Sequence, residues 1–168
     1  MTVRGAPLTA RSVVDSLIEC GATHVVWLPD TESGFLYETL RDEPRLKLVP
    51  VCREGEAVPV AAGLLVAGQK PVIIIQSTGL YESGDSLRGM AIDYQLPLLF
   101  LIGYRGYEGG RPSADSAATY LEPVLQAWGV PYHLVESDTS LHVIRQAYRE
   151  ARERPGPVAV LIGREYEA

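Results

Sequence analysis

Cysteine is scarce in the 168-residue chain: Cys20 and Cys52 are the only two, and neither lies in a Cys-x-x-Cys or Cys/His pattern. This usage excludes a disulfide framework and a zinc site as the basis of the fold. The chain also lacks a cluster of Lys and Arg, and its formal net charge is −6 at pH 7. Because phosphate binding requires concentrated positive charge, no nucleic-acid partner is expected.

Long apolar runs are missing as well. The most hydrophobic stretch, Leu96–Ile102, is too short to cross a bilayer, and the N-terminal residues lack the apolar segment of a secretory signal. We therefore expect no membrane association, and a cytoplasmic protein. Hydrophobic residues make up 46% of the chain and charged residues 21%, a globular composition that predicts a single domain over residues 1–168.

Short apolar runs alternate with segments of helical spacing along the whole chain. This order is typical of an α/β fold, here doubly wound, with a mainly parallel six-stranded sheet and helices on both faces. The expected strands are His24–Leu28, Leu46–Val51, Pro71–Gln76, Leu98–Ile102, Tyr132–Val135 and Val158–Ile162. The expected helices are Thr9–Cys20, Ser33–Arg41, Glu54–Ala67, Ser83–Tyr94, Ser116–Trp128 and Thr139–Glu153.

Polar residues follow the first four expected strands. Ligands of such sheets bind beyond the carboxyl ends of the strands, so these residues are the candidates for function. They include Asp30 after the first strand, Glu54 after the second, Ser77-Thr78-Gly79 after the third and Arg105 after the fourth.

Each candidate also has an ordinary structural explanation. A carboxylate at position 54 would favour the positive end of the following helix dipole. Asp30 could cap the helix that follows the first strand, and Ser77-Thr78-Gly79 could be a turn with an N-cap. Arg105 could be a surface cation near a turn. The residue types alone leave these alternatives open.

Longer motifs favour a functional interpretation. Arg53-Glu54-Gly55-Glu56, Ala61-Ala62-Gly63 and Gln76-Ser77-Thr78-Gly79-Leu80 follow one another in an order and spacing that resemble the pyrimidine-binding domain of thiamine-diphosphate-dependent 2-oxo acid decarboxylases. The likeness is greatest to the alpha subunit of sulfopyruvate and phosphonopyruvate decarboxylases. Leu28-Pro29-Asp30-Thr31 and Gly103-Tyr104-Arg105-Gly106 extend it over most of the chain.

The resemblance implies a role for each candidate. The glutamate that Glu54 matches hydrogen-bonds the aminopyrimidine ring of thiamine diphosphate and exchanges a proton with it, so Glu54 is expected to be catalytic and cofactor-binding. Asp30 becomes a second catalytic, proton-handling residue. Ser77, Thr78 and Gly79 are expected to contact the cofactor, and Arg105 to bind the anionic tail of a small 2-oxo acid substrate.

A Gly-Asp-Gly…Asn motif, which holds Mg²⁺ and the diphosphate in this family, is absent, and the chain contains no Asn at all. The resemblance therefore implies no metal ligand here, Mg²⁺ held by a separate diphosphate-binding (PP-domain) subunit, and a hetero-oligomer. One alternative is a noncatalytic binding or regulatory module that retains the fold, with Tyr81 in the cofactor pocket. A flavodoxin-like nucleotide domain is disfavoured, because no phosphate loop follows the first strand.

The sequence departs from the family at one turn. The family continues Gly-Leu-Gly-Asn, whereas Tyr81 and Glu82 follow Gly79-Leu80 here, and Asp85 comes soon after. A ring and two carboxylates thus replace small or amide groups beside the expected site. The identity of the 2-oxo acid stays open.

Overall fold

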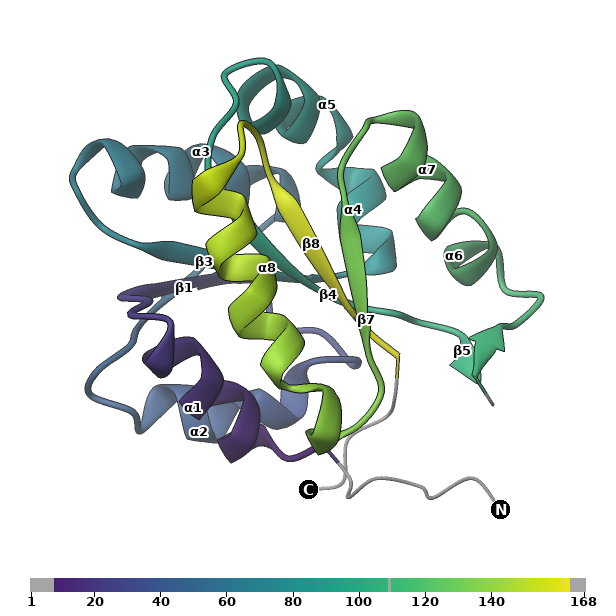
Figure 1. Ribbon diagram of the computed structural model, residues 1–168, viewed down its shortest axis with the longest axis horizontal. Coiled ribbons are helices and arrows are strands. Elements are labelled where there is room, and N and C mark those ends of the chain that lie inside the picture. The colour runs from purple at the N-terminus through teal and green to yellow at the C-terminus, as the bar shows by residue number, and fades with distance from the viewer. Residues whose placement is uncertain (1–7, 109, 164–168) are drawn as a thin grey trace.

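Six strands form one sheet in the computed structural model, which describes residues 8–108 and 110–163 (Figure 1). All neighbouring strands in this sheet are parallel, and their order is β2-β1-β3-β4-β8-β7, which confirms the predicted fold class. The strands are β1 (His24–Trp27), β2 (Lys47–Pro50), β3 (Pro71–Gln76), β4 (Leu99–Gly103), β7 (Tyr132–Val135) and β8 (Val158–Ile162). An antiparallel hairpin of β5 (Tyr107–Glu108) and β6 (Arg111–Pro112) lies apart from it.

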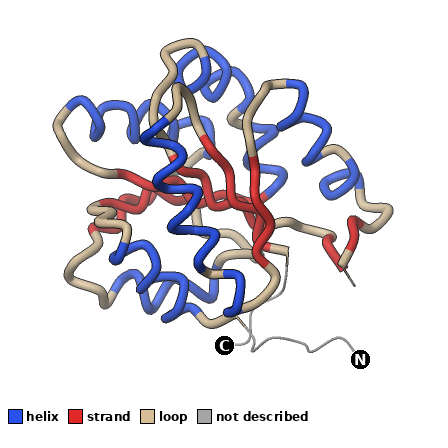
Figure 2. The backbone as a smooth tube through the Cα atoms, in the orientation of Figure 1, coloured by secondary structure: helices blue, strands red, loops and turns tan. Residues whose placement is uncertain are grey.

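Helices cover both faces of the sheet (Figure 1 and Figure 2). One face carries α1 (Ala10–Glu19), η1 (Gly34–Leu36), α2 (Tyr37–Arg41), η3 (Asp138–Ser140) and α8 (His142–Glu153). The other carries α3 (Glu54–Val66), α4 (Ser77–Glu82), α5 (Gly84–Ser86), the π-helical η2 (Leu87–Ile92), α6 (Ser116–Thr119) and α7 (Leu121–Ala127).

Each face of the sheet has its own apolar core. Successive strand residues point to opposite faces, so Ile74 belongs to the core on the side of α1 and α8, whereas Ile73 and Ile75 belong to the core on the side of α3 and α7. All three are nearly inaccessible to solvent. Burial on both sides explains why the strands are continuously apolar in sequence.

The expected helix Ser83–Tyr94 corresponds to α5 and η2, which together span residues 84–92, but the separate helix α4 before it was not predicted. Strand β3 ends at Gln76, whose backbone is extended, with φ −100° and ψ 176°. Helix α4 begins at the next residue, Ser77. Gly79 resembles a turn residue in sequence but lies within α4, where contact with another helix requires the absence of a side chain. The expected helix Ser116–Trp128 is likewise divided into α6 and α7 at Tyr120.

The strand order reverses at β1. The chain runs from β1 outward to β2 and then returns to β3 on the other side of β1. Ligands of open parallel sheets bind in the crevice at such a reversal, beyond the carboxyl ends of the strands. At the carboxyl ends of β3 and β4, Gln76 pairs with Gly103. The topology thus narrows the candidate site to the ends of β1 and β3.

Helix α3 is apolar on both its inner and outer sides. Val58 is fully buried against the sheet, whereas Pro59 and Gly63 are exposed and Val66 is 90% exposed. A helix that is hydrophobic all round is normally buried on every side. Neither α3 nor any other helix in the described part of the chain is long and apolar enough to cross a membrane.

We predict that Val58→Ala lowers the free energy of unfolding by about 2 kcal/mol, because it deletes buried methyl groups and leaves a cavity. Val66→Ala, on the same helix, is the matched control and should change it by less than about 0.5 kcal/mol. Urea unfolding followed by circular dichroism measures both. Equal losses in the two variants would contradict the assignment of the inner and outer sides of α3.

Candidate functional site

Glu54 is the first residue of α3, directly after the loop that follows β2. Its partly buried side chain lies against Gly79 of α4: a Cβ on Gly79 would be 2.7 Å from Glu54 Cγ and 2.9 Å from its Oε1. Within residues 8–108 and 110–163, its carboxylate makes no hydrogen bond or ion pair. A favourable interaction with the helix dipole would not by itself require Glu54 to lie so close to Gly79. The result is a carboxylate without a partner among the described residues at the carboxyl edge of the sheet.

The carboxylate of Glu82 holds the residues on either side of Glu54. Its Oε1 accepts hydrogen bonds from the Arg53 guanidinium, at 3.0 Å from Nε and closer from Nη2, and its Oε2 accepts from the Gly55 N–H at 2.5 Å. These hydrogen bonds, that of Arg53 foremost and that of Gly55 next, lower the pKa of Glu82. Sequence reasoning assigns no role to Glu82, because its partners lie 27 and 29 residues away along the chain.

The Ser77-Thr78-Gly79 segment forms the first turn of α4 rather than a separate turn. Ser77 is buried and its hydroxyl donates to the Gly103 carbonyl at 3.2 Å, while Thr78 is partly exposed. Next to them, Gln76 Oε1 is buried and has no hydrogen-bond partner among the described residues. Sequence reasoning missed Gln76 as a candidate, although it is the one polar residue of the otherwise apolar β3.

Asp30 shapes the loop after β1. Its Oδ1 accepts from the N–H groups of Glu32 and Ser33 at 2.8 and 2.9 Å, and its Oδ2 accepts from the Ser33 hydroxyl at 2.7 Å. The loop then crosses the end of β4, where a Cβ on Gly103 would be only 2.8 Å from Glu32 Cβ. Both oxygens of Asp30 thus hold the loop that forms one wall beside Gln76 and Gly103.

Arg105 lies farther along the same edge. Its half-exposed guanidinium is 3.3 Å from Asp115 Oδ2, and Asp115 also caps α6 by accepting from the Ala117 N–H at 2.9 Å. In the described part of the chain no hydrogen bond or ion pair joins Arg105 to Glu54, Asp30 or Ser77. The structure therefore brings Glu54 and Gly79 together but keeps Arg105 in a separate ion pair.

Tyr81 is directed away from Glu54. Two residues along a helix turn the side chain by about 200°, so Tyr81 lies on the far side of α4 from Gly79. Its hydroxyl donates to the Ala117 carbonyl of α6 at 2.9 Å. Burial, and secondarily the charge of Asp115, raise the pKa of Tyr81. The ring joins α4 to α6 and does not replace a ligand beside Glu54.

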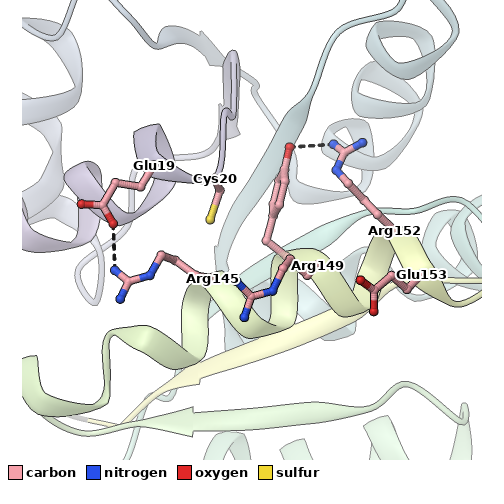
Figure 3. A pocket seen from close by; sticks show the side chains of 7 residues that line it. Glu19, Cys20, Arg145, Arg149, Arg152 and Glu153 are labelled. Carbon is pink, nitrogen blue, oxygen red and sulfur yellow. Dashed lines mark hydrogen bonds and ion pairs between the residues drawn. The ribbon is translucent and has the colours of Figure 1, made fainter.

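A surface pocket of about 340 Å³ lies between α1 and α8, on the other side of the sheet from α3 (Figure 3). Arg145 bonds to Glu19 there at 2.8 Å, and burial raises the pKa of the Cys20 thiol to about 11, so the thiol stays protonated at neutral pH. None of the candidate residues lines this pocket. It is therefore not the site that the sequence indicates.

Glu54 and Gln76 each present an oxygen that can accept a hydrogen bond from a ligand. Glu54 offers a carboxylate free of partners among the described residues, and Gln76 offers a buried carbonyl oxygen that requires a donor. Among residues 8–108 and 110–163, no group of three or more His, Cys, Asp or Glu side chains could hold a metal ion. A heteroaromatic ring with N–H groups matches these two acceptors, and a ring nitrogen matches Glu54 when its carboxyl group carries a proton.

Comparison with known proteins points to one family. Residues 8–111 match the sequence model of the family described as "Thiamine pyrophosphate enzyme, N-terminal TPP binding domain". Thiamine pyrophosphate is another name for thiamine diphosphate, so this match confirms the family resemblance that the sequence motifs indicate.

Several curated relatives have similar sequences. The alpha subunit of sulfopyruvate decarboxylase from Methanococcus maripaludis is 24% identical over 155 residues, which cover 91% of this chain and 93% of that protein. The sulfopyruvate decarboxylase of Methanosarcina acetivorans is 27% identical over 89% of this chain and 38% of its own length. The 1-deoxy-D-xylulose-5-phosphate synthase of Thermus thermophilus is 32% identical over 76% of this chain and 20% of its own length.

We predict that Gly79→Ala lowers the free energy of unfolding by about 1–3 kcal/mol, because the new methyl group overlaps the Glu54 side chain. The matched control is Gly63→Ala in α3, where the added Cβ meets no heavy atom within 4 Å apart from its chain neighbours and the nearby backbone of its own helix. This control should stabilise the protein by up to about 1 kcal/mol.

Urea unfolding of both variants and of Gly79→Ala/Glu54→Ala tests the cause. The double variant should recover most of the loss, because Glu54→Ala removes the three atoms that the new methyl group meets. A double variant as unstable as Gly79→Ala alone would show that Glu54 is not the source of the constraint.

Proposed function

The chain belongs to the thiamine pyrophosphate enzymes, through their N-terminal TPP-binding domain, and on this basis we propose that it is the pyrimidine-binding subunit of a 2-oxo acid decarboxylase. The observation that carries the proposal is the Glu54 carboxylate, free of partners in the described part of the chain and held against Gly79 at the carboxyl edge of the sheet.

The residues around Glu54 fit the pyrimidine half of thiamine diphosphate. Glu54 supplies an acidic group for the ring nitrogen, and the buried Gln76 Oε1 supplies an acceptor for an N–H donor. Gly79 keeps α4 free of a side chain where the Glu54 carboxylate lies. Ser77 and Thr78, in the same first turn, are proposed to contact the cofactor through the backbone.

The proposed mechanism assigns proton handling to Glu54. When bound, thiamine diphosphate supplies the electron sink for decarboxylation of a 2-oxo acid. Glu54 holds the proton that it shares with the pyrimidine ring nitrogen. Among the described residues no salt bridge or hydrogen bond competes with the cofactor for this carboxylate.

Asp30 and Arg105 receive the remaining roles in the proposal. Asp30 orients the loop over Gly103 and is the second group proposed to handle protons beside the substrate. Arg105 is proposed to bind the distal anionic group of the substrate. Its ion pair with Asp115 is half exposed, so exchanging that partner for a substrate anion costs little.

A second subunit completes the proposed site by holding the diphosphate and Mg²⁺. The relatives from Methanococcus maripaludis and Methanocaldococcus jannaschii are named as alpha subunits, and each match covers at least 90% of the relative. The exposed apolar side of α3, with Pro59, Gly63 and Val66, begins about one and a half helical turns after Glu54 and is the surface proposed to pack on that subunit. The enzyme would then be a hetero-oligomer.

We predict that Glu54→Gln in the reconstituted complex lowers kcat by about 10²- to 10⁴-fold, because the amide keeps the shape of the side chain but cannot exchange the proton. Release of carbon dioxide from sulfopyruvate and other 2-oxo acids, with thiamine diphosphate and Mg²⁺ present, measures the effect. Folding stability should change by less than about 0.5 kcal/mol.

Glu56→Gln is the matched control, since Glu56 lies on the same helical turn and its side chain bonds to the Cys52 N–H, at 3.0 Å. This variant should keep its activity within about two-fold. A further control omits the second subunit and should show no turnover. Activity of the chain alone, or an unchanged kcat in Glu54→Gln, would overturn the proposed function.

For Arg105 we predict a change in specificity rather than in overall activity. Arg105→Met should lower the ratio of kcat/KM for a 2-oxo acid with an anionic tail to that for a neutral one by about 10–150-fold, because a charge-assisted contact of roughly 1.5–3 kcal/mol is lost. Arg88→Met, which removes another exposed, ion-paired arginine, is the control. An unchanged ratio in Arg105→Met would show that Arg105 does not bind the tail.

A further inference from the structure

One carboxylate fixes both chain neighbours of Glu54. Glu82 Oε1 bonds to the side chain of Arg53, which precedes Glu54, and Glu82 Oε2 bonds to the backbone N–H of Gly55, which follows it. No other side chain in the described part of the chain bonds to both of these residues. Any displacement of Glu82 therefore acts directly on the segment that carries Glu54.

The first turn of α3 needs an acceptor that its own sequence does not provide. The first N–H groups of a helix lack partners within the helix, and an N-cap side chain usually accepts one of them. Here the N-cap is Arg53, whose guanidinium can only donate, and it makes no cap hydrogen bond. Glu82, from the last position of α4, supplies the missing acceptor at Gly55.

Two positions on one side of α4 act on the same short segment. Gly79 and Glu82 are three residues apart, so they lie next to each other on the helix surface. Gly79 provides the space in which the Glu54 side chain lies, and Glu82 secures the backbone from which that side chain projects. Helix α4 thus constrains both the side chain of Glu54 and the backbone from which it projects.

We propose that Glu82 is a positioning residue for Glu54, holding the first turn of α3 so that the Glu54 carboxylate keeps its orientation over Gly79. This inference rests on the proposed function of Glu54. It gives a role to the position where the sequence departs from the family, since a carboxylate stands there instead of a small or amide group.

The contacts of Glu82 with Arg53 and Gly55, called the clamp below, contribute to the orientation of Glu54 more than to folding stability. Arg53 is 73% exposed in its side chain and Glu82 is 30% exposed, and ion pairs so accessible to solvent add little to stability. The hydrogen bonds from Arg53 and Gly55 lower the pKa of Glu82, so the clamp is fully charged at neutral pH. Small displacements of a catalytic group can nevertheless cost a large factor in rate.

The first test is a double-mutant cycle on the complex with its second subunit. Glu82→Ala should lower kcat by about 10- to 100-fold with little change in KM for the 2-oxo acid. Glu82→Gln, which keeps an acceptor for Gly55, should recover activity to within about three-fold of the wild type. In the Glu54→Gln background, Glu82→Ala should change kcat by less than about two-fold, because the group that it positions is gone.

The second test uses the chain alone and needs no activity. Backbone hydrogen exchange at Gly55, followed by NMR, should be at least about 10-fold faster in Glu82→Ala than in the wild type and should return toward the wild-type rate in Glu82→Gln. Asp85→Ala is the control, since Asp85 pairs with Arg88 instead, at 2.7 Å. It should leave the exchange of Gly55 and the kcat of the complex unchanged.

The outcomes separate the two hypotheses. Loss of activity in Glu54→Gln together with full activity in Glu82→Ala overturns the positioning role and leaves the proposed function intact. Equal losses from Glu82→Ala in both backgrounds show that Glu82 does not act through Glu54, and they also overturn the inference. An active Glu54→Gln complex overturns the proposed function itself, whatever Glu82→Ala does to the exchange of Gly55.

Discussion

The contact between Glu54 and Gly79 depends on the absence of a side chain, and most features of the candidate site follow from it. A single methyl group on Gly79 would meet three atoms of Glu54 within 3.1 Å. Without that group, the first turn of α3 can lie against the first turn of α4, which starts directly at the end of β3. With these two turns in contact, the Glu82 carboxylate reaches both Arg53 and Gly55.

The parallel sheet supplies the rigid support for this contact. Its central strands are buried on both faces, so polar groups collect where the strands end. The strand order reverses at β1, and the loop held by Asp30 lies over Gly103 near this reversal. A buried amide oxygen on Gln76 without a partner among the described residues is tolerated in a folded protein where a ligand supplies the donor.

Local sequence was sufficient for the sheet but not for the helices near the site. The strands Pro71–Gln76, Tyr132–Val135 and Val158–Ile162 have the expected bounds, because burial on both faces leaves an unbroken apolar run. Helix α4 was missed since Ser77, Thr78 and Gly79 favour turns, and a tertiary contact decides their conformation. The sequence motifs indicated Glu54 as a candidate residue. The role of Glu82 depends on partners 27 and 29 residues away, which no local sequence pattern reveals.

The helices on the two faces of the sheet expose different kinds of side chain to solvent. Helix α8 presents charged residues outward, whereas the outer side of α3 is apolar, and Val66 is 90% exposed. Exposed apolar surface of this kind promotes aggregation and recognition by chaperones and proteases. In the proposed hetero-oligomer, any copy of this chain without its second subunit would leave this side of α3 exposed to water. If that proposal holds, the composition of one helix would favour balanced amounts of the two subunits.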